Sequence, residues 1–227
     1  MARAAAKRKS SGRRAAARKR NDRKARSRKL INDEIGLKKQ LEKVATKRRA
    51  LPPGNPVKED YVFDEGSGRT IKLSQLFKGG KNELLIYHYM FAPKDNRPCP
   101  MCTMWCDGYD RIEPYVRKRA NFALVTKAPI KKLRAWARGR GWKNIRLLSS
   151  YGTTFNRDFG VEDKNEEQSP AISVFTKDDD GTVRHFYQKF ASMSAAHWRG
   201  IDQLSPVWNL FDLLPSGRGD WYPNYEQ

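Results

Sequence analysis

Short apolar runs alternate with segments of helical periodicity through most of this chain. Runs rich in β-branched and aromatic residues predict strands at residues 61–63, 71–73, 84–91, 122–126 and 145–148. Apolar residues at helical spacing predict helices at residues 103–119 and 129–140, and a brief helix at 153–159. Few charges interrupt residues 84–91, which is typical of a central strand covered on both faces.

A β-hairpin follows these elements. Residues 169–175 have a strand pattern, Asp178-Asp179-Asp180-Gly181 is a tight turn, and residues 183–187 supply the antiparallel partner. Residues 205–213 predict a closing apolar helix. The order β-α-β-α-β-α-β-β-α predicts an α/β fold class, a mixed β-sheet with helices on both faces.

The N-terminal segment has a different composition. Residues 1–50 hold 20 of the 46 Lys and Arg residues but 4 of the 25 Asp and Glu residues, so most of the formal net charge of +21 lies there. Residues 1–29 carry too little apolar surface to offset their ordering entropy, which predicts a disordered basic arm. Residues 30–56 predict an N-terminal helix and a Pro-rich linker, residues 57–214 one domain with its own core, and residues 215–227 a C-terminal tail.

The basic arm suits a partner that carries phosphate. Nonspecific contact of residues 1–29 with nucleic acid or another anionic surface is one interpretation, and a solvating extension is the other. No aromatic residues interleave with these charges, and no zinc finger or RNA-stacking motif is present, so nothing predicts the reading of bases.

The expected location is the cytoplasm. No apolar stretch is long enough to span a bilayer, and the N-terminus has no apolar region that would make a secretory signal. The Arg-rich start resembles an organelle transit peptide in composition, but no amphipathic face exists before Leu30. Three cysteines, two of them in C-x-x-C, suit a reducing compartment. We expect no membrane partner.

Two thiols lie at a predicted strand-to-helix junction, in Cys99-Pro100-Met101-Cys102. A helix start supplies free N–H groups and a partial positive charge, which stabilise a thiolate, the attacking species in disulfide exchange. This setting favours Cys99 as the catalytic nucleophile and Cys102 as the thiol that resolves a mixed disulfide. A bare C-x-x-C is also compatible with a structural pair or half of a zinc site.

Two neighbours are auxiliary candidates. Cys106 would fall on the helix face of Cys102, either as a buried small residue or as a competing resolving thiol. His88 shares a predicted strand face with Leu84, Ile86 and Met90, which favours a hydrogen-bonded core histidine over a proton shuttle.

A metal site is the remaining alternative for these cysteines. They could bind zinc or an iron–sulfur cluster together with His88, His185 or His197, but C-x2-C-x3-C is not a usual ligand spacing and no second C-x-x-C exists. We therefore expect neither a metal nor a bound cofactor.

The order of elements, with a dithiol after the first long strand, resembles the thioredoxin superfamily. Members of that superfamily have a cis proline just before the first strand of the hairpin, facing the dithiol, and Ser169-Pro170-Ala171 occupies this place. The resemblance implies that the Ser169–Pro170 bond is cis and packs beside Cys99, with the backbone of Ser169 pairing with an extended substrate. The insertion at residues 122–161 resembles that of peroxiredoxins and related thiol reductases.

Three longer motifs, at residues 88–93, 99–107 and 149–156, are similar to one bacterial family. It is the thioredoxin-like family known as a domain of unknown function (DUF 899), for which dithiol–disulfide oxidoreductase activity is predicted. The resemblance covers residues 33–214 and leaves out residues 1–29 and Cys106. It draws attention to Trp105 as a substrate-binding residue and to Asp107, either as the proton acceptor for Cys102 or in a helix-capping or surface role.

The sequence thus predicts a thiol–disulfide oxidoreductase that uses Cys99 and Cys102 on a protein or small-molecule disulfide or thiol substrate, with a separate reductant. A thiol peroxidase is one alternative. Peroxiredoxins have Pro, then Thr or Ser, then Cys in a fixed loop, whereas no hydroxyl residue lies between Pro93 and Cys99 here. The other alternative is a nucleic-acid-associated binding protein on the same scaffold, because fold alone does not fix function.

Overall fold

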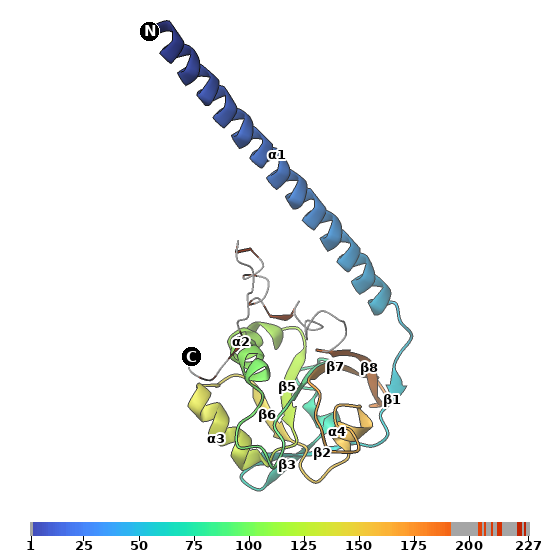
Figure 1. Ribbon diagram of the computed structural model, residues 1–227. Helices are drawn as coiled ribbons and strands as arrows, with labels where there is room; N and C mark the ends of the chain where they lie inside the picture. Colours follow the sequence, from blue (N-terminus) through green and yellow to red (C-terminus); the bar gives the residue numbers. More distant parts are fainter. Residues whose placement is uncertain are drawn as a thin grey trace. The chain divides into compact units, whose positions relative to one another are not determined.

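A computed structural model of the protein (Figure 1) describes residues 2–191 and, beyond them, Leu204, Ser205, Val207, Leu210, Leu213, Leu214, Tyr222, Pro223 and Tyr225. Side chains are described from residue 17 onward. The chain divides into two units, residues 1–52 and residues 53–227. The helix predicted for residues 205–213 lies largely outside the described residues.

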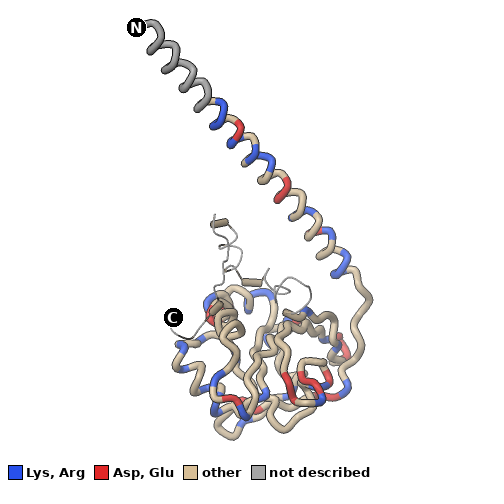
Figure 2. Tube along the Cα trace, in the orientation of Figure 1, with Lys and Arg blue, Asp and Glu red and all other residues tan. Residues whose placement is uncertain are grey.

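The first unit is one long helix, α1 (Ala2–Arg49). The structure differs here from the prediction of a disordered arm at residues 1–29, because these residues continue the helix predicted from Leu30. Ala, Arg and Lys have high intrinsic helix propensity, and no proline precedes Pro52, so a helix does not require a buried face. Side chains 17–34 are exposed, and Lys and Arg are spread along the described length of α1 (Figure 2).

We expect deletion of residues 1–29 to leave the second unit folded. The deleted side chains that are described are all exposed, so the melting temperature of the remaining chain should change by no more than about 2 °C. The far-UV circular dichroism should lose helical signal in proportion to the deleted length. A thermal melt of the truncated chain tests this, and a fall of many degrees would show that these residues pack against a folded core.

The second unit contains a mixed sheet in the order β1-β8-β7-β4-β5-β6-β2-β3. Its strands are β1 (Asn55–Pro56), β2 (Val62–Gly66), β3 (Arg69–Lys72), β4 (Glu83–Tyr89), β5 (Asn121–Thr126), β6 (Arg146–Ser149), β7 (Ala171–Lys177) and β8 (Val183–Phe190). The strands β4, β5 and β6 are parallel, and β7 pairs antiparallel with β4. The predicted central position of β4 and the predicted hairpin β7–β8 are both confirmed.

Helices cover both faces of this sheet (Figure 1). On one face, α2 (Pro100–Val116) and α3 (Ile130–Arg140) pack with Tyr87 and Tyr89 of β4 in one apolar cluster. On the other face, the 3-10 helix η1 (Leu73–Leu76) and α4 (Phe155–Asp158) pack with Leu84 and Ile86 in a second cluster. Side chains alternate along a strand, so β4 contributes to both clusters. The predicted α/β fold class is therefore confirmed.

The predicted linker ends inside the sheet. Asn55 and Pro56 form β1, which pairs with β8 at His185 and Arg184. The chain approaches β8 so closely that a Cβ on Gly54 would lie 1.9 Å from the carbonyl oxygen of His185. Glycine is needed at this position because any side chain would meet the backbone of the neighbouring strand.

A buried carboxylate ties α2 to the chain that leads into β6. Asp110 is 2% exposed, and its Oδ1 accepts hydrogen bonds from the backbone N–H groups of Lys143, Asn144 and Ile145 at 2.9, 2.8 and 3.1 Å. The side chain of Asn144 donates to the carbonyl of Asp110 at 2.9 Å. Consecutive N–H groups that converge on one oxygen fix the connection after α3 against α2.

Within the part of the chain that the structure describes, none of the helices has the length and apolar character needed to cross a membrane.

Candidate dithiol site

Cys99 lies where the predicted helix begins. It is the N-cap of α2, with extended φ and ψ of −60° and 128°, and Pro100 occupies the first helical position. Proline suits that position because its missing N–H would have had no helical partner. The Cys99 sulfur accepts a hydrogen bond from the backbone N–H of Cys102 at 3.4 Å. A sulfur in this place meets the positive end of the helix.

The two thiols of the pair differ in exposure. Cys99 is partly exposed, whereas Cys102 is fully buried on the first turn of α2. Cys102 contributes to the apolar cluster that also holds Tyr87 and Trp105. Of the two residues, Cys99 therefore offers the solvent-exposed surface to a second molecule.

The two thiols also differ in acidity. A hydrogen bond from the Cys102 thiol lowers the pKa of Cys99 to about 7, against the effect of burial, and backbone N–H groups of Cys102 and Met101 add to this effect. Burial raises the pKa of Cys102 well above its usual value, and its hydrogen bond to Cys99 acts in the same direction. When the pair loses its first proton, near neutral pH, the negative charge thus lies on Cys99 rather than on Cys102.

We expect the alkylation rate of Cys99 to rise with pH around a midpoint near 7. The thiolate is the reacting form, so the rate should be low below pH 6 and level above about pH 8, at least tenfold higher than at pH 6. Cys102 and Cys106 should stay unmodified throughout this range because burial raises both pKa values and blocks access. Iodoacetamide labelling followed by peptide mapping measures each thiol separately. If Cys102 or Cys106 reacts first below pH 7, the assignment is wrong.

An apolar cavity of about 150 Å³ opens beside the dithiol. It is lined by Met90, Cys99, Met101, Cys102, Trp105, Pro170, Ala191 and Tyr222. Trp105, predicted to bind substrate, forms an inner wall because it is only 1% exposed. The lining residues other than the cysteines and Tyr222 offer apolar surface, so the cavity suits an apolar group next to a reacting sulfur.

Pro170 lies beside the dithiol, but its peptide bond differs from the prediction. Pro170 lines the cavity with Cys99 and Cys102, which confirms that the two are close. The predicted cis bond is wrong, because no cis peptide bond occurs among the described residues. The N–H of Ser169 donates to the carbonyl of Val161 at 3.0 Å, and the carbonyl of Pro170 accepts from Ala191 at 3.1 Å. Bonds within the chain thus occupy the Ser169 N–H that was predicted to pair with substrate.

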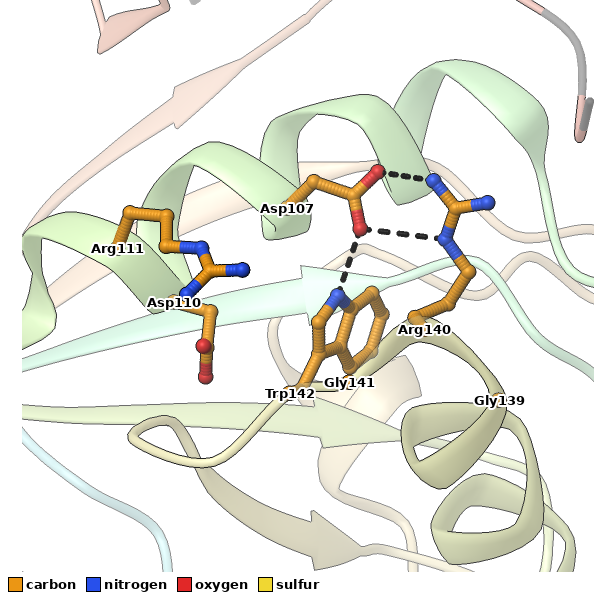
Figure 3. Close-up of a pocket in the computed structure, with 7 residues that line it drawn as sticks. All are labelled: Asp107, Asp110, Arg111, Gly139, Arg140, Gly141 and Trp142. Carbon is orange, nitrogen blue, oxygen red and sulfur yellow. Dashed lines mark hydrogen bonds and ion pairs between the residues drawn. The ribbon is translucent and has the colours of Figure 1, made fainter. Parts of the chain in front are cut away.

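Asp107 bonds away from the dithiol, toward α3. Its carboxylate forms an ion pair with Arg140 and accepts a hydrogen bond from Nε1 of Trp142 at 2.7 Å (Figure 3). These residues line a polar cavity of about 160 Å³ together with Asp110, Arg111, Gly139 and Gly141. Two strong donors hold the carboxylate, so the structure gives Asp107 a role in joining α2 to α3. Of the predicted roles, this differs from proton acceptor and helix cap, whereas the partly exposed side chain fits the surface role.

Cys106 lies one turn beyond Cys102 and is fully buried. Burial raises the pKa of its thiol well above the usual value, and the charge of Asp107 acts in the same direction. A buried, protonated thiol is a poor nucleophile, so its environment is that of a small apolar residue.

His88 faces the opposite side of the sheet from the cysteines. It is 2% exposed, its Nε2 lies 2.8 Å from Oγ of Ser173, and its ring stacks on Phe155 of the second cluster. Burial lowers the pKa of His88 to about 3, so the ring is neutral. It is a hydrogen-bonded core residue and does not reach the dithiol. Met90 departs from the predicted shared face, since β4 ends at Tyr89 and Met90 turns into the dithiol cavity.

The sequence analysis did not identify four residues of the cavity as site residues: Met90, Met101, Ala191 and Tyr222. Met90 lies at the cavity because β4 ends at Tyr89, and Ala191 lies there because it directly follows β8. A strand boundary is not visible in an uninterrupted apolar run, and no pattern in the sequence brings Tyr222 to this site. Among the described residues, no three His, Cys, Asp or Glu side chains are grouped as a metal site would require.

Comparison with models of protein families shows which family the chain belongs to. The model of a family described as bacterial protein of unknown function (DUF899) matches residues 13–226. The chain belongs to this family. The resemblance predicted from the three motifs is thus confirmed, and the DUF899 match begins earlier than predicted, within the basic part of α1. No curated protein matches the chain.

The chain is also similar in fold to solved structures whose names include peroxiredoxin, peroxidoxin or thioredoxin. A cysteine-to-serine mutant of PrxQ from Xylella fastidiosa has a TM-score of 0.50 at 14% identity, over 69% of this chain and 95% of that chain. Peroxidoxin BcpB from Mycobacterium tuberculosis has a TM-score of 0.46 at 19% identity, over 68% and 94%. The exposed lipoprotein thioredoxin of Streptococcus pneumoniae has a TM-score of 0.42 at 16% identity, over 64% and 96%. The PrxQ likeness shows that the DUF899 chain has a thioredoxin-like fold.

Proposed function

We propose that this DUF899 protein is a thiol–disulfide oxidoreductase whose reactive pair is Cys99 and Cys102. The Cys99 thiolate attacks one sulfur of a substrate disulfide, and the other substrate sulfur leaves as a thiolate and takes up a proton. Cys102 then loses its proton and attacks the Cys99 sulfur, which releases the second substrate thiol and forms the Cys99–Cys102 disulfide. The substrate gains two electrons, and an external thiol reductant restores the pair.

The difference between the two thiols carries this proposal. Cys99 is partly exposed at the start of α2 with a pKa of about 7, whereas Cys102 is buried behind it with a raised pKa. Disulfide exchange needs one accessible attacking thiolate and one protected resolving thiol within its reach. A merely structural pair would have no need for a lowered pKa at its exposed member.

The reduction potential of the pair tests the proposal. The full chain is equilibrated in glutathione or dithiothreitol redox buffers, and its disulfide state is read by alkylation and mass mapping. We expect one two-electron transition that joins Cys99 to Cys102, at a potential between about −270 and −120 mV. Cys106→Ala is the matched control and should keep this transition. A pair that never oxidises, or a disulfide that includes Cys106, would contradict the proposal.

Thiol peroxidase activity is the alternative for the same Cys99 thiolate. It is less well supported because no Thr or Ser lies between Pro93 and Cys99 to bind a peroxide as in peroxiredoxins. Parallel assays with hydrogen peroxide and with a protein disulfide such as insulin, under one reductant, separate the two activities. Faster turnover of the peroxide than of the disulfide would favour the peroxidase.

We also propose that α1 contacts nucleic-acid phosphates without reading sequence. Residues 17–29 are exposed on one continuous helix and hold eight Lys and Arg residues against a single Asp (Figure 2). If this segment contacts about six phosphates, affinity for duplex DNA should fall about a thousandfold between low and moderate salt. Titrations of the full chain and of a chain without residues 1–29 test this, and equal binding by both would exclude a role for the segment.

A further inference from the structure

The peptide unit that precedes Cys99 is fixed at both of its polar atoms. The N–H of Cys99 donates to the carbonyl of Met90, directly after β4, at 3.1 Å. The carbonyl of Pro98, at the other end of the same peptide unit, accepts a hydrogen bond from the hydroxyl of Tyr225. Pro98 is buried, so this carbonyl depends on a partner from the protein. A residue 127 positions further along the chain therefore bonds directly to the loop before the nucleophile.

Tyr225 is itself held from several sides. Its ring makes an edge contact with Trp136 of α3, with ring centroids 5.3 Å apart, and the guanidinium of Arg97 lies 5.3 Å from the ring centroid. Its carbonyl accepts from Nη1 of Arg140 at 3.3 Å. Burial raises the pKa of Tyr225, so its hydroxyl stays protonated and able to donate across the range in which Cys99 titrates.

These contacts lead back to the dithiol helix. Arg140, which bonds to Tyr225, also forms the ion pair with Asp107 of α2 (Figure 3). The connection thus runs from α2 through Asp107, Arg140 and Tyr225 to Pro98, directly before the N-cap of α2. Tyr222, three residues before Tyr225, lines the dithiol cavity. Tyr222 and Tyr225 of the C-terminal tail are therefore part of the structure around Cys99.

We propose that Tyr225 is a positioning residue for Cys99, which holds the Pro98–Cys99 peptide unit in the orientation that the N-cap requires. This inference rests on the proposed function, because it matters only if Cys99 is the attacking thiol. Rotation of that peptide unit would move the Cys99 sulfur away from the N–H groups of Cys102 and Met101. Its pKa would then rise, since these groups lower it.

The test is the pH dependence of Cys99 alkylation in full-length Tyr225→Phe. Loss of one hydrogen bond should raise the alkylation midpoint above that of the parent and slow the reaction below pH 7 by about three- to tenfold. Tyr225→Leu also removes the ring contacts and should raise the midpoint further. Tyr115→Phe is the matched control: it removes the same atom from an exposed tyrosine on α2 and should behave as the parent.

Each result has one interpretation. A parent midpoint at the ordinary thiol value would overturn the proposed function itself. A parent midpoint near 7 that Tyr225→Phe leaves unchanged would overturn only the role of Tyr225. The melting temperature of Tyr225→Phe should stay within about 2 °C of the parent. A large fall in that temperature together with altered reactivity would assign Tyr225 a general structural role and would also overturn the inference.

Discussion

We expect replacement of Cys99 by serine to prevent the first step of the proposed disulfide exchange, and replacement of Cys102 by serine to stop the reaction one step later. Cys99 is the accessible thiol with the lowered pKa, so Cys99→Ser removes the attacking group and should lower the exchange rate by at least about a hundredfold. In Cys102→Ser the first attack still occurs, but no second thiol resolves the product. This variant should accumulate a stable mixed disulfide between Cys99 and substrate.

Mass spectrometry of each variant after incubation with an excess of a disulfide substrate measures the outcome. Cys106→Ala is the control because Cys106 is buried with a raised pKa, and it should retain full exchange without a trapped adduct. An adduct on Cys102 in the Cys99→Ser variant would reverse the two roles. Retained activity in both single variants would show that neither thiol is the nucleophile.

The position of the dithiol could be predicted because its signals are local. An apolar run, a C-x-x-C sequence and a helical pattern in succession predict a strand-to-helix junction, and the structure has β4, then Cys99 as N-cap, then α2. The hairpin could also be predicted, from the Asp-Gly sequence of its turn. In the structure Gly181, with a φ of 90°, closes the turn between β7 and β8.

The basic arm shows where reasoning from burial alone is incomplete. Residues 1–29 have little apolar surface, which argues against a packed core but not against a helix. Alanine, arginine and lysine lose little side-chain freedom in a helix, so local propensity favours α1 without burial. The first turns of α1 accordingly come from propensity rather than from the apolar spacing that begins at Leu30.

The contacts that arrange the site could not be predicted, because they join distant parts of the chain. Asp107 is a candidate for proton transfer from the sequence because it lies close to Cys102 along the chain. In the structure, however, Arg140 and Trp142, at and just after the end of α3, bind its carboxylate. The bond from Tyr225 to Pro98 spans 127 positions. The peptide bond before Pro170 is another example. The resemblance to the thioredoxin superfamily correctly predicted that Pro170 lies near Cys99, but it did not predict the trans geometry of the bond.

Asp110→Ala should cause a large loss of stability, because it removes the buried carboxylate that ties α2 to the chain leading into β6. Its Oδ1 accepts hydrogen bonds from three consecutive backbone N–H groups. The last of these belongs to Ile145, which is only 7% exposed. Water can replace the acceptor for Lys143, which is exposed, but it reaches the N–H of Ile145 poorly. The expected cost is about 2–4 kcal/mol in the free energy of unfolding, because a buried donor without a partner costs about 1–3 kcal/mol.

For a unit of this size, such a loss corresponds to a fall in melting temperature of about 5–15 °C, which a thermal melt measures directly. Asp110→Asn keeps one oxygen that can accept these N–H groups, so it should lose less than half as much. Asp179→Ala is the matched control: it removes the same side chain from an exposed turn position and should change the stability by no more than about 0.5 kcal/mol. Asp110→Ala that melts within 2 °C of the parent would show that the connection into β6 is held by other contacts. In that case the attachment of α2, and with it the position of the dithiol, would depend on the apolar cluster around Tyr87 and Trp105.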